Sequence, residues 1–185
     1  EENKKQIIFQ FKSSFEREYV IPFASGTQAL SFVIEASTNS EAHVGISNAN
    51  CVNVLQAVLY SGRRPVILPT DLAGNICLKK LQNVKLDAIV GVSQFASLTN
   101  RRSLKKYCDI NGLRYIDDCC RNYFIPLTES DKKNFIDPTI ISFGAGKIIQ
   151  NNSGGAIVLT NSKRLSDKLG IVANKYKQGK SEHSK

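Results

Sequence analysis

The chain alternates between short apolar runs and longer segments whose apolar residues recur every three or four positions. The short runs are rich in β-branched residues, and such uninterrupted apolar runs are typical of strands buried on both faces. We therefore expect strands at residues 43–47, 64–68, 86–92, 113–118, 139–143 and 154–160.

The longer segments predict amphipathic helices between these strands. Helices are expected over residues 25–37, 50–62, 100–112 and 161–174. Ser25 is a suitable N-cap for the first of them, while Gly62 and Gly112 are suitable residues to end the second and third. Alternating strands and helices predict an α/β domain with a mostly parallel sheet.

The 185 residues suggest one domain over 1–185, with 1–14 as an N-terminal extension and 175–185 as a basic tail. No apolar run approaches the roughly 20 residues of a membrane span, and the polar start at 1–5 does not resemble a secretory signal. An odd number of cysteines, five, with Cys119 and Cys120 adjacent, favours reduced thiols in the cytoplasm. Their spacing matches no zinc pattern, so we expect no metal.

The formal net charge of +9 indicates an anionic partner. The basic residues are spread along the chain, and no basic motif interleaved with aromatic residues is present. A solvated positive surface with a frayed basic tail therefore explains the charge better than a nucleic-acid interface.

Three polar features fall where strands end or helices begin. They are Gly26-Thr27, Asp117-Asp118 and the segment 142–147, in which Lys147 follows the turn Gly-Ala-Gly. Ligands of parallel sheets bind beyond the carboxyl ends of the strands. We expect the three features to meet at that edge, where one aspartate could face solvent while the other points into the site.

Each feature alone has an ordinary explanation: a helix cap, a pair of solvated acids, or a lysine on a surface loop. Together they supply what pyridoxal phosphate needs, namely a phosphate cradle, an acid for the ring nitrogen, and a lysine that forms a Schiff base. The cradle is expected to comprise Gly26, Thr27 and Ser142, the acid to be Asp118, and the lysine to be Lys147.

A set of motifs occurs in the order found in one enzyme family. The motifs are "FEREY", "SGTQAL", "SGRRPVILPTD", "YIDDCC", "SFGAGK" and "NNSGGAIVLT". In them the chain resembles the DegT/DnrJ/StrS aminotransferases, which are fold-type I pyridoxal phosphate enzymes that mostly act on nucleotide-linked keto-sugars. The resemblance covers about the whole chain. It implies the three-layer α/β/α large domain of that fold, without the family's C-terminal small domain.

The resemblance also implies roles for particular residues. Asp118 matches the aspartate that pairs with the pyridine nitrogen, and Lys147 matches the Schiff-base lysine. Ser142 and Thr27 match phosphate contacts, and Asn174 matches an asparagine that reaches the partner subunit's cofactor. A homodimer is therefore expected.

The chain departs from the family pattern at several positions. Cys51 stands where an aromatic residue or histidine usually stacks on the cofactor ring, and a cysteine cannot stack in that way. Residues 93–96 replace a histidine-containing segment, and Arg121 stands where glutamine or histidine is common. These departures, and the expected lack of a small domain, count against efficient catalysis.

Three functions are consistent with these observations. The first is an enzyme that moves an amino group from a glutamate-type donor to a nucleotide-linked keto-sugar, for a surface polysaccharide or a natural product. The second is a degenerate member that binds the cofactor or a partner without turnover. The third is a basic nucleotide- or nucleic-acid-binding domain in which Lys147 only contacts phosphate. We expect the first.

Overall fold

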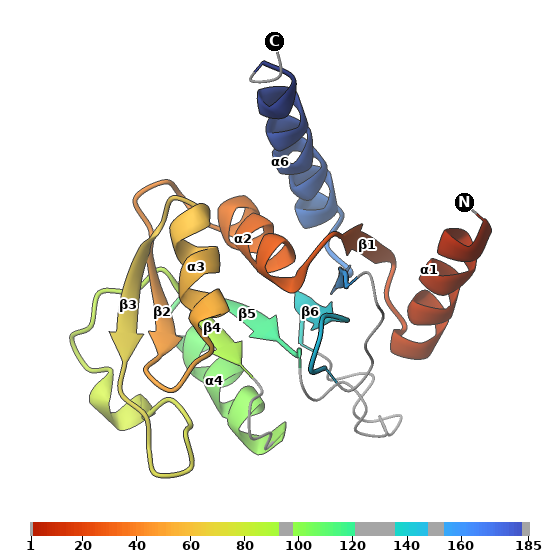
Figure 1. Cartoon of the computed structure of the whole chain (residues 1–185). Helices are drawn as coiled ribbons and strands as arrows, with labels where there is room; N and C mark the ends of the chain where they lie inside the picture. The colour runs from red at the N-terminus through yellow and green to blue at the C-terminus, as the bar shows by residue number, and fades with distance from the viewer. Residues whose placement is uncertain (1, 93–97, 121–135, 148–153, 183–185) are drawn as a thin grey trace.

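The computed structural model describes residues 2–92, 98–120, 136–147 and 154–182. The strands are β1 (Tyr19–Phe23), β2 (His43–Ser47), β3 (Arg64–Leu68), β4 (Ala88–Val92), β5 (Arg114–Asp118), β6 (Thr139–Ser142) and β7 (Ala156–Thr160). The helices are α1 (Glu2–Phe15), α2 (Gly26–Ser37), α3 (Val52–Tyr60), α4 (Leu98–Ile110), α6 (Lys163–Glu182) and the short 3₁₀ helix η1 (Leu78–Lys80). Figure 1 shows their arrangement.

All seven strands form one sheet in the order β1-β7-β6-β5-β4-β2-β3. Neighbours from β6 to β3 pair in parallel, whereas β7 is antiparallel to both β1 and β6. Six strands therefore run in one direction and β7 in the other, which confirms the mostly parallel sheet. The carboxyl ends of the six strands therefore share one edge with the amino end of β7.

The sheet is covered by helices on both faces, because consecutive strand residues point to opposite sides. In β7, Val158 packs into a core formed with α2, α3 and α6, whereas Leu159 packs on the other face with Phe15 of α1. On that second face, Tyr115 of β5 packs with Leu104 of α4. The result is the expected three-layer α/β/α arrangement.

Two terminal segments differ from or extend the expectation. The extension at 1–14 forms helix α1, in which Phe11 stacks on Phe15 with ring centroids 5.8 Å apart. The expectation of a frayed basic tail at 175–185 is wrong for residues 175–182, which continue α6.

The strand β1 was not expected from the sequence. It contains Pro22 and lies at the edge of the sheet.

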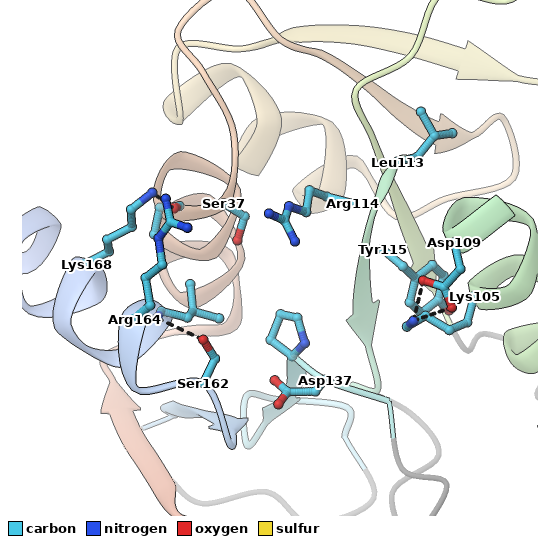
Figure 2. Close-up of a pocket in the computed structure, with 13 residues that line it drawn as sticks. Ser37, Lys105, Asp109, Leu113, Arg114, Tyr115, Asp137, Ser162, Arg164 and Lys168 are labelled. Atoms are coloured by element: carbon cyan, nitrogen blue, oxygen red, sulfur yellow. Dashed lines mark hydrogen bonds and ion pairs between the residues drawn. The ribbon is translucent and has the colours of Figure 1, made fainter. Parts of the chain in front are cut away.

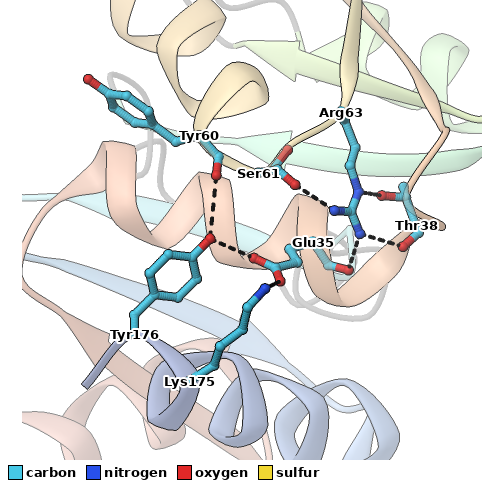
Figure 3. A network of polar contacts seen from close by, with 7 residues as sticks. All are labelled: Glu35, Thr38, Tyr60, Ser61, Arg63, Lys175 and Tyr176. Carbon is cyan, nitrogen blue, oxygen red and sulfur yellow. Dashed lines mark hydrogen bonds and ion pairs between the residues drawn. The ribbon is translucent and has the colours of Figure 1, made fainter. Parts of the chain in front are cut away.

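Contacts to α2 explain why α6 continues. The Tyr176 ring stacks on Phe32 at 4.9 Å, and its hydroxyl donates to Glu35 at 3.2 Å. The Lys175 ammonium donates to the same carboxylate at 2.9 Å (Figure 3). Arg63 donates to the Glu35 and Thr38 carbonyl oxygens at 3.1 and 2.9 Å, which satisfies the end of α2. Together these contacts hold α2, α6 and the turn after α3 in place.

Candidate functional site

A cavity of about 410 Å³ lies at the carboxyl-end edge of the sheet. The last residues of three neighbouring parallel strands line it: Val92 of β4, Asp118 of β5 and Ser142 of β6. Their proximity follows from the topology, because parallel strands in register end together. Six of the seven predicted site residues line this cavity: Gly26, Thr27, Cys51, Asp118, Ser142 and Lys147.

The amino terminus of α2 forms one wall of the cavity. Ser25 caps this helix, since its hydroxyl accepts from the Gln28 N–H at 3.1 Å and its carbonyl from the Ala29 N–H at 3.0 Å. The N–H groups of Gly26 and Thr27 have no hydrogen-bond partner among the residues that the structure describes. Two backbone donors and the positive end of the helix dipole are thus available to an anion.

Gly26 and Ser142 approach each other closely across the cavity. A Cβ at Gly26 would lie 2.9 Å from Ser142 Oγ and 3.8 Å from Cys120 Sγ. A side chain at position 26 would therefore occupy the space between the helix amides and the Ser142 hydroxyl. Ser142 is itself buried and lines the cavity.

Asp117 and Asp118 point to opposite faces of β5. Asp118 lines the cavity, whereas Asp117 is directed at α4, where Arg101 Nε donates to its Oδ1 at 2.9 Å and a second guanidinium nitrogen donates to Oδ2. Thr139 also donates to Asp117 at 3.0 Å. The expectation that one aspartate could face solvent is wrong, because their exposed fractions are 0 and 5%. Arg101, which neutralises Asp117, was not singled out from the sequence.

The environment of Asp118 favours a neighbouring cation. Burial raises the pKa of Asp118, while hydrogen bonds from Cys120 and the charge of Lys147 oppose that rise. One of these bonds runs from the Cys120 N–H to Asp118 Oδ1 at 3.1 Å. Burial and the adjacent Asp118 also raise the pKa of the Cys120 thiol well above its ordinary value. A cation at Asp118 would stabilise its ionised form.

Lys147 reaches the cavity from a tight turn after β6. Its N–H donates to the Gly144 carbonyl at 3.2 Å, and Gly146 adopts a φ of +76° at the third position of the turn. The side chain is half-buried and lines the cavity. Its charge acts on Asp118 and on Cys120, so the lysine belongs to the same electrostatic cluster as the strand-end acid.

Other lining residues were not predicted as site residues from the sequence. Asn53 of α3 and Cys120, two residues after Asp118, are among them. Cys120 might have been found from its spacing, since a loop residue two after a strand-end acid often bonds to it. Asn174 lies exposed on α6 and does not line the cavity. Residues 93–96 and position 121 lie outside the described ranges, so their departures from the family pattern stay predictions.

Within the described ranges, no helix is long and apolar enough to cross a membrane. The same residues contain no group of three or more His, Cys, Asp or Glu side chains placed to hold a metal ion. All five cysteines lie in the described part of the chain, and none forms a disulfide bond.

Comparison with known proteins identifies the family of this chain. Residues 3–183 match the DegT/DnrJ/EryC1/StrS aminotransferase family, and the chain belongs to this family. A GDP-perosamine synthase of Vibrio cholerae is 24% identical over 179 residues, which are 90% of this chain and 48% of that protein. The resemblance inferred from the ordered motifs is thereby confirmed.

Two solved structures show the same fold. NtdA of Bacillus subtilis, solved with bound cofactor PMP, superposes with a TM-score of 0.77 at 21% identity over 89% of this chain and 38% of its own. DesI, solved in the presence of its TDP-sugar product, gives 0.77 at 19% identity over 92% and 44%. The expected fold class is confirmed. The chain spans about half the length of the curated relative that it matches.

Proposed function

We propose that this chain binds pyridoxal phosphate and serves the transfer of an amino group from an amino-acid donor to a nucleotide-linked keto-sugar. The observation that carries the proposal is the convergence of Lys147, Asp118 and Ser142 with the free amides of α2 on one cavity. Family membership supports the reaction class. The printed names of the relatives, a GDP-perosamine synthase and DesI with a TDP-sugar, support the substrate class.

The phosphate end of the cofactor fits the α2 terminus. A phosphate dianion would accept from the Gly26 and Thr27 amides, and the Thr27 and Ser142 hydroxyls are side-chain donors in the same lining. The absence of a Cβ at Gly26 keeps the space between amides and Ser142 open. This space is the structural reason to assign the cradle to these three residues.

The ring and aldehyde ends fit Asp118 and Lys147. Asp118 is buried and has a raised pKa, so it would gain from a protonated pyridine nitrogen as its ion-pair partner. Lys147 would hold the cofactor covalently through its amine and, once released, could move a proton of the substrate. The cofactor, when bound, would supply an electron sink for that proton transfer.

The proposal also covers the oligomeric state, the charge of the substrate and the cellular compartment. We propose a homodimer in which Asn174, exposed on α6, reaches the partner subunit's cofactor. The net charge of +9 suits a substrate with a nucleotide diphosphate. We place the reaction in the cytoplasm, where five cysteines without disulfide bonds are compatible with the reducing conditions.

Trapping the cofactor tests the proposal. The protein is incubated with pyridoxal phosphate, reduced with borohydride, digested, and the labelled peptide is found by mass spectrometry. An adduct at Lys147 is expected, and it should disappear in Lys147→Ala but persist in Lys79→Ala, which removes an exposed lysine outside the cavity. Labelling elsewhere, or equally in both variants, would contradict the assignment.

A second measurement separates turnover from binding. The loaded protein is mixed with glutamate and a nucleotide-linked keto-sugar, and formation of 2-oxoglutarate and of the amino-sugar is followed. Formation of both products supports the transferase. An adduct at Lys147 without products would support the alternative, a family member that keeps the fold and binds cofactor without turnover.

A further inference from the structure

A second cavity of about 410 Å³ lies at the opposite edge of the sheet, where β5 and β6 begin. The ends of α2 and α4 and the first turns of α6 complete its walls (Figure 2). Arg114 opens β5 and Asp118 closes it, so the strand separates the two cavities by about 13 Å, from the rise of roughly 3.3 Å per residue. None of the residues proposed to hold pyridoxal phosphate lines this second cavity.

Four cationic side chains line this cavity. Lys105 is paired with Asp109, which leaves Arg114, Arg164 and Lys168. Arg164 and Lys168 are four residues apart on α6 and therefore share one face of the helix. Figure 2 shows them extending from α6 on the same side, with Arg114 extending from β5 toward Ser37. Lys168 donates to the Ala36 carbonyl at 3.2 Å, but the Arg114 and Arg164 guanidinium groups have no side-chain partner among the described residues.

The acidic groups of the same lining are already engaged. Asp109 accepts from Lys105 at 2.6 Å, so this pair is neutral overall. Asp137 accepts from the Thr160 hydroxyl at 2.5 Å and from the Asn161 N–H at 2.8 Å. The charges of Lys105 and Asp109 cancel. The remaining carboxylate of the lining, that of Asp137, is outnumbered by three cations. Like charges held at i,i+4 and across a cavity repel one another, and a bound anion would remove that repulsion.

We propose that this cavity binds a small phosphate-bearing anion of the diphosphate class. A guanidinium presents two parallel N–H groups to phosphate oxygens, so Arg114 and Arg164 could each bind in a bidentate manner, with Lys168 as a point charge. Ser37 adds a half-buried hydroxyl. Leu113, Pro138 and Leu165 line the same space and would contact the organic part of the ligand. The site is independent of the proposed cofactor site.

Calorimetric titration with inorganic pyrophosphate at constant ionic strength tests the site. Saturable binding is expected for the unmodified chain, and at least tenfold weaker binding for the double variant Arg114→Gln/Arg164→Gln. Both arginines are exposed, so the variant should fold, which circular dichroism checks. Arg64→Gln removes one such charge at an exposed position outside the cavity and should leave the affinity unchanged.

Hydrogen exchange with and without pyrophosphate locates the bound anion. Protection is expected in peptides covering residues 105–118 and 162–168. Protection at the start of α2 instead would place the anion in the other cavity and overturn the proposal. Equal affinity in all three proteins, or no saturable binding, would overturn it too. If the double variant is unfolded, Arg164→Gln alone must still weaken binding, and unchanged binding would refute the site.

Discussion

The backbone of Gly26 and the side chain of Ser142 leave no room for a Cβ between them: an added one would lie 2.9 Å from Ser142 Oγ. The first turn of α2 therefore approaches the end of β6 only because position 26 is glycine. This contact joins two segments 116 residues apart in the sequence and shapes the proposed phosphate cradle.

Gly26→Ala should weaken binding of pyridoxal phosphate by roughly tenfold, because the methyl group displaces the Ser142 hydroxyl and overpacking of this kind costs about 1–3 kcal/mol. Absorbance titration with the cofactor measures the change. Gly144→Ala is the matched control in the same cavity, since its Cβ would lie 3.7 Å from Ser142 Oγ, an ordinary contact. Equal losses in both variants would argue against the cradle.

Asp118→Asn should stabilise the cofactor-free protein as the pH rises. Burial raises the folded-state pKa of Asp118 above its ordinary 3.8, so the stability linked to its protonation is complete below that value and is lost as the pH rises through the raised pKa. Asparagine cannot ionise, so its contribution does not fall as the pH rises. Denaturant unfolding at about pH 4 and pH 8 should show the variant gaining relative to the parent only at the higher pH. A constant difference would contradict the raised pKa.

The same substitution should impair cofactor binding, because asparagine cannot pair ionically with a protonated ring nitrogen. The variant is thus expected to be more stable without the cofactor and to bind it less tightly. If Asp118 had only a structural role, the substitution would change the stability without weakening cofactor binding.

Arg101→Met should destabilise the fold by about 3–5 kcal/mol, because it leaves the carboxylate of Asp117 buried without its ion partner. Burial disfavours the charged guanidinium, yet Asp117 outweighs it and the pKa of Arg101 is raised. Urea unfolding measures the loss. Lys106→Met, at an exposed position on the same helix, should change stability by about 0.5 kcal/mol or less. Similar effects in both would show that the ion pair contributes little.

The five thiols should differ in their reaction with iodoacetamide at pH 8. Burial raises the pKa of Cys108 to about 12 and that of Cys120 well above its ordinary value, so both should react only after unfolding. Cys51 is exposed and should be labelled first. Peptide mass spectrometry against time gives the order of labelling.

Pyridoxal phosphate should slow labelling of Cys51, because this residue lines the same cavity as Lys147. Cys77 is partly exposed and lies outside that cavity, so its rate serves as the control. Protection of both thiols would indicate a general effect, and protection of neither would place the cofactor away from Cys51.

Local patterns in the sequence were sufficient for the central elements. The strands expected at 43–47 and 64–68 agree with β2 and β3, because the valine and isoleucine in each favour the extended backbone of a sheet. Gly62 and Gly112 do have the positive φ that ends a helix in this way, at +71° and +66°. The pattern was weaker for β1, where Pro22 interrupts an edge strand, and for the last turns of α6.

The sequence by itself determined the strand and helix alternation, the mostly parallel sheet, and the candidate residues at strand ends, since these depend on local periodicity and on the general geometry of parallel sheets. Only the tertiary structure decided that Asp117 pairs with Arg101 whereas Asp118 faces the cavity with Lys147. It likewise decided that Arg114 meets Arg164 and Lys168 at the other edge. Such partnerships join residues far apart along the chain, and packing of the layers, which no local pattern encodes, brings them together.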